Sequence, residues 1–154
     1  MPPSILLCSD LDRTLLPNGT APESPQARRR LRAVAARPEL MLVYVSGRHE
    51  GLLRRAISDY DLPVPDYAVG DVGTSIYEIH GGDWCPLREW TEHIASDWAC
   101  ADRGDLAALF ADLDSLHLQE PEKQNTFKLS YYTSSDVQRD DLLAEMRSRL
   151  QGMG

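Results

Sequence analysis

Two aspartates and a threonine follow a short apolar run near the start of the chain. In the segment LLCSDLDRTLLPNG (6–19), one residue separates Asp10 from Asp12, and one separates Asp12 from Thr14. Two carboxylates this close repel each other unless a cation or a hydrogen-bond donor compensates their charge. Mg²⁺ would do so, and it would also bind a phosphate oxygen. A solvated loop in which one aspartate caps a turn is the alternative, but the preceding apolar run and Thr14 favour the metal site.

The same carboxylate pair has the chemistry for phosphoryl transfer. One carboxylate could attack phosphorus and form an aspartyl phosphate. The other could protonate the leaving alcohol and later activate water, and such proton transfer typically contributes about 10²–10⁴-fold in rate. These roles require a phosphate receptor close by.

Ser46, Gly47 and Arg48 form a candidate phosphate receptor. They end a second apolar run (40–45) and precede a predicted helix. A hydroxyl group, a backbone N–H that glycine leaves accessible and a helix N-terminus together suit a phosphate group. Helix capping by Ser46 would explain this motif if it stood alone. The carboxylates that end the first apolar run favour the phosphate receptor.

The elements that must position these residues alternate along the first seventy residues. Buried strands are expected at 4–8, 40–45 and 67–69. A helix that begins after Ser24 and ends at Pro38, and a second helix that carries Leu53 and Ala56, separate them. This alternation predicts a parallel sheet with crossover helices. The site is expected at the carboxyl ends of the strands, where Asp71 either lines it or belongs to a simple turn.

The second half of the chain has a different pattern. A half-exposed strand at 75–79 is followed by the hairpin turn Gly81-Gly82, and a short helix is expected at 105–113. Strands at 116–119 and 127–132 and a final helix complete an α+β unit with antiparallel strands. We place the boundary between the two parts near residues 78–84.

One polar stretch of this second part could contact a ligand. The segment EKQNTFKLSYY (122–132) contains Gln124, Asn125 and Lys128. On a strand, Lys128 faces away from its neighbours Phe127 and Leu129 and could point at a ligand. A lysine on the solvated face of a half-exposed strand explains the pattern slightly better.

Composition limits the class of protein. The 154 residues include 16 basic and 24 acidic ones, for a net charge of −8. This argues against nucleic acid or an anionic membrane as a partner, but not against a small phosphorylated substrate. Three scattered cysteines, Cys8, Cys85 and Cys100, fit free thiols in a reducing compartment. Without a membrane-spanning run or a signal-peptide pattern, we expect a cytoplasmic protein.

Four segments, in this order and spacing, resemble a known family. SDLDRTLL (9–16), VYVSGR (43–48), DYAVGDVGTSIY (66–77) and FKLSYY (127–132) are similar to phosphatases of the haloacid dehalogenase (HAD) superfamily, subclass IIB. The greatest similarity is to the sucrose-phosphate phosphatase group. The resemblance implies an α/β fold, with a Rossmann-like parallel sheet in an incomplete HAD core at 1–80 and an inserted α+β cap at 81–154.

The resemblance also implies a Mg²⁺-dependent phosphatase that hydrolyses a sugar phosphate through an aspartyl phosphate. Asp10 would be the nucleophile and Asp12 the general acid and base, and Mg²⁺ would bind to both. The implied phosphate-binding residues are Leu11, Thr14, Ser46, Gly47 and Arg48. The implied substrate-binding residues are Asp71, Gln124, Asn125 and Lys128.

Two later motifs of that superfamily, a lysine and an acidic GDxxxD-like loop, are not found in this sequence. We therefore expect the N-terminal portion of such an enzyme, which by itself binds Mg²⁺ weakly and has little or no activity. An open apolar edge of the first strand would promote self-association. Two further hypotheses remain: a non-catalytic sugar-phosphate-binding or regulatory protein, and a receiver-like phosphoacceptor. In the latter, Asp71 rather than Asp10 would carry the phosphate.

Overall fold

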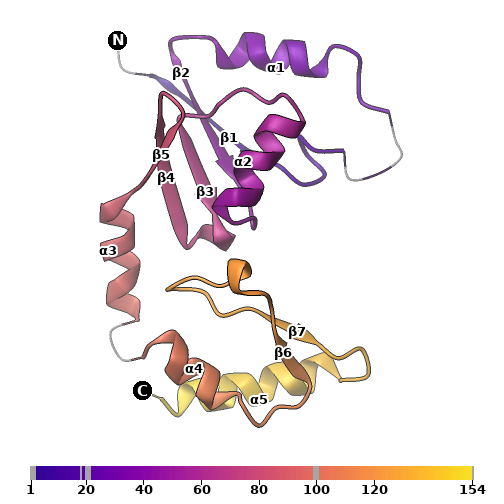
Figure 1. The fold of residues 1–154 in the computed structure, drawn as a ribbon, viewed down its shortest axis with the longest axis vertical. Coiled ribbons are helices and arrows are strands. Elements are labelled where there is room, and N and C mark those ends of the chain that lie inside the picture. Colours follow the sequence, from indigo (N-terminus) through magenta and orange to yellow (C-terminus); the bar gives the residue numbers. More distant parts are fainter. Residues whose placement is uncertain (1–2, 18, 20–21, 99–100, 154) are drawn as a thin grey trace. The chain divides into compact units, whose positions relative to one another are not determined.

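The computed structural model describes residues 3–17, 19, 22–98 and 101–153 (Figure 1). The chain divides into two compact units, Met1–Glu92 and His93–Gly154, which are described separately below. This division lies beyond the boundary that we placed near 78–84, because the hairpin after residue 75 belongs to the sheet of the first unit. The assignment of a core at 1–80 and a cap at 81–154 stays a prediction.

The first unit contains a mixed five-stranded sheet with the strand order β1-β2-β3-β4-β5. The first three strands are parallel and the last two run antiparallel to their neighbours. This arrangement confirms the α/β class. The strands are β1 (Ile5–Asp10), β2 (Leu40–Val45), β3 (Tyr67–Gly70), β4 (Ser75–His80) and β5 (Asp83–Pro86). The crossover helices are α1 (Ala27–Ala35) and α2 (Glu50–Asp59).

The core of this unit lies on one face of the sheet. Tyr44 and Ala68 are fully buried and are paired in register. They belong to a cluster that includes Leu53 of α2, and Leu31 of α1 packs against it. Both crossover helices therefore cover the same face, as right-handed connections between successive parallel strands require.

The expectation of a buried first strand is wrong, because each residue of β1 is exposed or only half-buried. Within the described part of the chain β1 pairs only with β2, so β1 is an edge strand. Ile5 and Leu6 are 47% and 62% exposed. An apolar run of strand length predicts the strand, but burial also requires neighbours on both sides and both faces.

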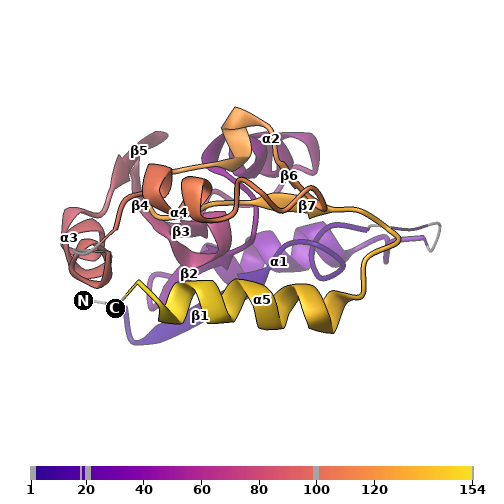
Figure 2. The same ribbon diagram turned by 90° about the horizontal axis from the view of Figure 1, so that it is seen from below.

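The second unit combines two short strands with helices. β6 (Leu116–Leu118) pairs antiparallel with β7 (Tyr131–Thr133), and Figure 2 shows α5 (Arg139–Gln151) running along this pair. α4 (Arg103–Leu109) begins with a capping box between Asp102 and Asp105. The sequence did not predict α3 (Arg88–Asp97), which continues from the first unit into the second.

The expected strand at 127–132 begins only at Tyr131. The preceding residues form a turn in which the Asn125 N–H donates to the Lys128 carbonyl oxygen at 3.2 Å. The Asn125 side-chain oxygen accepts a hydrogen bond from the Phe127 N–H at 2.8 Å. Such side-chain-to-backbone bonds compete with strand pairing. Lys128 therefore lies in this turn and not on a strand.

The cysteines and the helices were also the subject of predictions. Cys8 and Cys85 are exposed free thiols, whereas Cys100 lies outside the described residues. None of the described helices has both the length and the apolar character needed to cross a membrane.

Candidate active site at the ends of the parallel strands

The segments that follow β1, β2 and β3 lie side by side. Asp10 is in register with Val45 at the ends of β1 and β2. The Ser46 N–H donates to the Val69 carbonyl oxygen at 2.9 Å, which joins the end of β2 to β3. The Asp10 loop, the Ser46 turn and the Asp71 segment thus lie together at the carboxyl ends of the parallel strands, as predicted.

A buried leucine fixes the loop after β1. Leu11 is fully buried, and its carbonyl oxygen accepts hydrogen bonds from the N–H groups of Thr14, Leu15 and Leu16 at 3.2, 3.0 and 2.7 Å. Arg13 adopts the left-handed conformation, with φ of 63°. This tight turn anchors Leu11 in the core and holds the flanking aspartates at the end of the strand.

Asp10 is exposed to solvent and is oriented by Thr14. The Thr14 hydroxyl donates to Asp10 Oδ2 over 3.2 Å. An accessible, oriented carboxylate is what a nucleophile at this position needs.

Asp12 forms an ion pair with Arg48. Arg48 Nε donates to Asp12 Oδ2 at 2.9 Å, and Arg48 Nη2 donates to Asp12 Oδ1 at 2.6 Å. The two side chains are 29% and 38% exposed. The hydrogen bond to Asp12 raises the pKa of the Arg48 guanidinium above its ordinary value. The structure therefore shows Arg48 on the second carboxylate, and phosphate binding by Arg48 stays a prediction.

Ser46 is 5% exposed and does not cap the following helix. The N-cap residue of α2 is His49, and Ser46 Oγ accepts instead from the Arg48 N–H at 3.2 Å. Helix capping, the simpler explanation of the Ser46-Gly47-Arg48 motif, is therefore wrong. Gly47 is exposed next to Ser46, which leaves its backbone N–H region accessible. This turn keeps the features that suit a phosphate group.

Asp71 is a buried carboxylate in a strained segment. It is 4% exposed, and Ser75 Oγ donates to its Oδ2 at 3.3 Å. Asp71 and Val72 both have positive φ, 52° and 61°. Non-glycine residues in this conformation cost on the order of 1–3 kcal/mol each and are concentrated at functional sites. Val72 is 75% exposed and was not among the predicted site residues. Nothing in the sequence predicts positive φ at this position, because valine disfavours that conformation.

The three candidate residues of the second unit lie within one short stretch. The Gln124 side-chain amide is hydrogen-bonded to backbone groups. Its Nε2 donates to the carbonyl oxygens of Gln119 and Ser130, both at 2.9 Å. Gln124 Oε1 accepts from the Ser130 N–H at 2.7 Å. Asn125 and Lys128 close the adjoining turn. A substrate-binding role for these residues remains a prediction.

The residues at the end of β1 fit a magnesium ion. Within the residues that the structure describes, no three His, Cys, Asp or Glu side chains gather as a metal-binding group. Mg²⁺ commonly needs only one or two protein carboxylates and completes its shell with water and substrate phosphate. The exposed Asp10 carboxylate and the Asp12 carbonyl offer the hard oxygen donors that this ion prefers.

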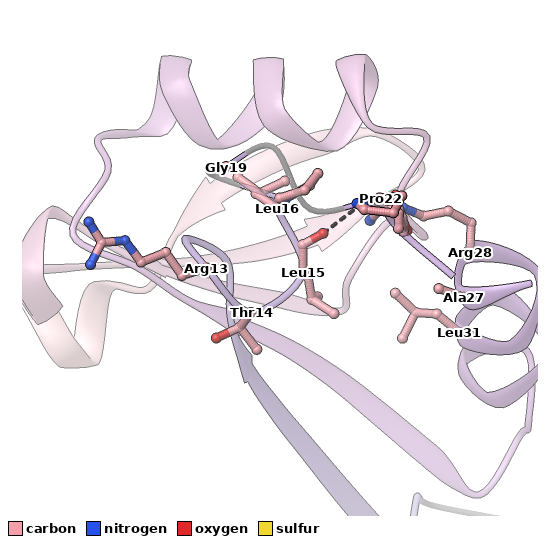
Figure 3. A pocket seen from close by; sticks show the side chains of 11 residues that line it. Arg13, Thr14, Leu15, Leu16, Gly19, Pro22, Ala27, Arg28 and Leu31 are labelled. Carbon is pink, nitrogen blue, oxygen red and sulfur yellow. Dashed lines mark hydrogen bonds and ion pairs between the residues drawn. The ribbon is translucent and has the colours of Figure 1, made fainter. Parts of the chain in front are cut away.

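A pocket of about 390 Å³ adjoins the Asp10 loop (Figure 3). It lies between the residues that follow Asp12 and the start of α1. Arg28 of α1 donates to the Leu15 carbonyl oxygen at 2.6 Å, the contact marked in Figure 3, and pairs with Glu23. The bond to Leu15 connects α1 to the loop that carries the aspartates.

Comparisons with known proteins point to one family. The family model described as sucrose-6F-phosphate phosphohydrolase matches residues 3–154. A putative HAD-like hydrolase of Nitrosococcus oceani is 54% identical over 154 residues, which are 100% of this chain and 42% of that protein. A probable sucrose-phosphatase 1 of Arabidopsis thaliana is 30% identical over 132 residues, which are 84% of this chain and 30% of that protein. The chain thus spans less than half the length of these relatives.

Solved structures share the fold. The sucrose-phosphatase of Synechocystis sp. PCC6803, in complex with sucrose and phosphate, superposes with a TM-score of 0.75 at 25% identity. That match covers 97% of this chain and 57% of the Synechocystis chain. The HAD-like hydrolase yhjK of Bacillus subtilis has a TM-score of 0.63 at 14% identity, over 99% of this chain and 57% of that chain. The second likeness shows the fold alone.

Proposed function

The chain belongs to the sucrose-6F-phosphate phosphohydrolase family of HAD-like hydrolases, and from this premise we propose that the protein hydrolyses a sugar phosphate of the sucrose-phosphate type. One observation carries the proposal. The sheet places an exposed carboxylate, Asp10, at the strand end next to a second carboxylate, Asp12, and the Ser46 turn. Nucleophile, proton donor and phosphate receptor are the three parts that hydrolysis of a phosphate ester needs.

In the first half of the reaction, an Asp10 carboxylate oxygen attacks phosphorus. The bond between phosphorus and the sugar oxygen breaks, and Asp12 gives its proton to that oxygen as the sugar leaves as an alcohol. Ser46 and the Gly47 N–H bind the phosphoryl oxygens during the transfer. The product on the protein is an aspartyl phosphate at Asp10.

In the second half, Asp12 accepts a proton from a water molecule that attacks the same phosphorus. The bond between phosphorus and the Asp10 oxygen breaks, and inorganic phosphate leaves. Asp10 is again a free carboxylate and Asp12 is again protonated, so the cycle closes. Asp12 therefore acts first as acid and then as base.

Asp10 and the Asp12 carbonyl would hold Mg²⁺, which would supply positive charge to offset the negative charges of the carboxylate and the phosphate. Asp71 is buried beside the same strand ends, and we include it among the residues that line the site. Selection of the sugar is assigned to the cap at 81–154, through Asn125, Lys128 and Gln124. The exposed edge of β1 supports the further proposal that the chain self-associates there.

The receiver-like alternative is disfavoured by burial. A phosphoacceptor must meet its donor, but Asp71 is 4% exposed whereas Asp10 is exposed. The non-catalytic alternative predicts binding of a sugar phosphate without release of phosphate. Turnover therefore separates it from the proposed function.

The proposed function is tested by phosphate release from a panel of sugar phosphates that includes sucrose phosphate, with Mg²⁺ present and protein in excess of substrate. Asp10→Asn is nearly isosteric, so it should keep the circular dichroism spectrum and lose at least about 10³-fold in rate, the scale of nucleophile loss. Asp59→Asn, on the exposed end of α2, is the matched control and should keep the wild-type rate. Release of no phosphate by the wild type, or more than a tenth of its rate by Asp10→Asn, would contradict the proposal.

A further inference from the structure

We infer that Arg48 is the positioning residue for Asp12: its guanidinium binds the ionised form of this general acid and base through both carboxylate oxygens, and so fixes the orientation that proton transfer needs. This inference rests on the proposed function and adds to it a residue that acts through another. It differs from the predicted role of Arg48, which was direct binding of phosphate.

The contact itself is specific to arginine. Nε and Nη2 lie on the same side of the planar guanidinium group, and each donates to a different oxygen of Asp12, at 2.9 and 2.6 Å. Two parallel charge-assisted bonds fix the plane of the carboxylate as well as its position. A lysine ammonium is a point charge on a flexible stem and cannot impose that plane.

The backbone N–H and carbonyl groups of Arg48 are both hydrogen-bonded. Its N–H donates to Ser46 Oγ at 3.2 Å, and its carbonyl oxygen accepts from the Asp71 N–H at 2.8 Å. Ser46 is in turn bonded to Val69 of β3. The guanidinium group therefore extends from a point that is fixed to two neighbouring strands.

Asp12, in contrast to Arg48, lies on the loop after β1. It precedes Arg13, which has positive φ, and its regular backbone pairing is a single bridge to Leu16. Proton transfer depends on a donor–acceptor distance within hydrogen-bond reach, and a misplacement of about 1 Å can cost on the order of 10²-fold in rate. A rigid partner 36 residues away along the chain supplies the constraint that the loop alone lacks.

A kinetic double-mutant cycle tests the inference. It uses Arg48→Gln, Asp12→Asn and the double variant, with a sugar phosphate and with p-nitrophenyl phosphate, whose leaving group needs no proton. Arg48→Gln should lower kcat for the sugar phosphate by roughly 10–10²-fold, with a smaller loss in the phosphorylation step on p-nitrophenyl phosphate. In the Asp12→Asn background, Arg48→Gln should lower kcat by less than about a further threefold. The reason is that both substitutions remove the same function, proton transfer by Asp12.

Arg48→Lys separates orientation from charge. A residue that binds phosphate by charge should be largely rescued by lysine, and its loss should raise KM equally for both substrates. A positioning residue should not be rescued, and its loss should appear in kcat. Arg48→Lys also keeps the inference testable if Arg48→Gln does not fold. Arg54→Gln is the matched control, because Arg54 pairs with Glu50 within α2, and it should leave both rates unchanged.

The outcomes distinguish this inference from the proposed function. If the wild type is active and Asp10→Asn is not, but the losses from Arg48→Gln and Asp12→Asn multiply, the positioning role is wrong and the proposed function stands. The positioning role is also wrong if Arg48→Lys restores kcat, or if Arg48→Gln slows the phosphorylation step by the same factor on both substrates. The proposed function stands in these cases too. No turnover by the wild type would overturn both.

Discussion

The backbone N–H of Asp71 donates a hydrogen bond to the backbone carbonyl oxygen of Arg48 at 2.8 Å. This bond joins the segment after β3 to the turn after β2, and so links the buried carboxylate to the residue that holds Asp12. Gly70 makes the approach possible. A Cβ atom at position 70 would lie 3.0 Å from the Arg48 carbonyl oxygen and 3.0 Å from Leu53 Cδ1.

Gly70→Ala should therefore be destabilising. The backbone of Gly70 has φ of −116°, which alanine adopts freely, so the cost is steric. Forcing an extra methyl group into this contact should lower the free energy of unfolding by about 1–3 kcal/mol. Gly47→Ala is the control for stability, because its Cβ would meet only Val72 Cγ2, at an ordinary 3.8 Å. Urea unfolding of the two variants measures the difference; equal stabilities would show that the Gly70 contact relaxes without cost.

Val72→Asn should increase stability. Val72 is 75% exposed with φ of 61°, so it contributes little burial while its branched side chain disfavours the left-handed conformation. Asparagine tolerates that conformation, and the expected gain is about 0.5–1 kcal/mol. Val64→Asn, at a valine that is 64% exposed with an ordinary backbone, should give no gain. If the two variants have the same midpoint of urea unfolding, the strain at Val72 is absent in solution.

Residues in local patterns were predictable from the sequence, and residues in long-range contacts were not. The run 40–45 was predicted as a strand and forms β2 with the same bounds. The run at 4–8 has similar composition, but β1 lies at an edge of the sheet, and no local pattern reports the number of neighbours. The pair of Arg48 and Asp12 joins residues 36 positions apart, so spacing alone could not reveal it.

Side-chain chemistry also overrode local propensity. Phe127 and Leu129 flank Lys128 with the alternation of a strand, yet Asn125 closes a turn across this stretch. Val72 belongs to the residues that favour strands, but the chain turns left-handed there. Both departures occur in segments that carry candidate site residues, where local rules are most often broken.

Tyr44 should make stability sensitive to alkaline pH. Burial raises the pKa of its hydroxyl from 10.0 to about 12, and this hydroxyl donates to the Pro63 carbonyl oxygen at 2.9 Å. The neutral form is favoured in the folded state, so this stabilisation is fully present below the unfolded pKa and is lost as pH rises toward the folded pKa.

Tyr44→Phe should lower the free energy of unfolding near neutral pH by about 1 kcal/mol, because the Pro63 carbonyl loses its donor. The variant should also lose less stability than the wild type between pH 10.0 and about 12. Tyr60→Phe, at a tyrosine that is 38% exposed, is the control and should keep the wild-type pH profile. Urea unfolding across this range is the measurement, and parallel profiles for Tyr44→Phe and wild type would contradict the role of Tyr44.

Gln124→Glu should loosen the second unit. The substitution removes the Nε2 group that donates to the Gln119 and Ser130 carbonyl oxygens. Loss of these bonds should cost about 1–3 kcal/mol, read as faster amide hydrogen exchange in β6 and β7. Gln138→Glu, at an exposed position before α5, should leave the exchange unchanged. A raised KM with unchanged exchange would instead assign Gln124 to substrate binding.

Asp10 carries the phosphoryl group in the proposed reaction. The direct measurement is rapid chemical quench of the protein with a sugar phosphate, borohydride reduction of the acyl phosphate, and peptide mass mapping. Reduction converts a phosphorylated aspartate to homoserine, and we expect homoserine at position 10, where the carboxylate is exposed and accepts a hydrogen bond from Thr14. Homoserine at position 71, or phosphate release with no modified aspartate, would contradict it.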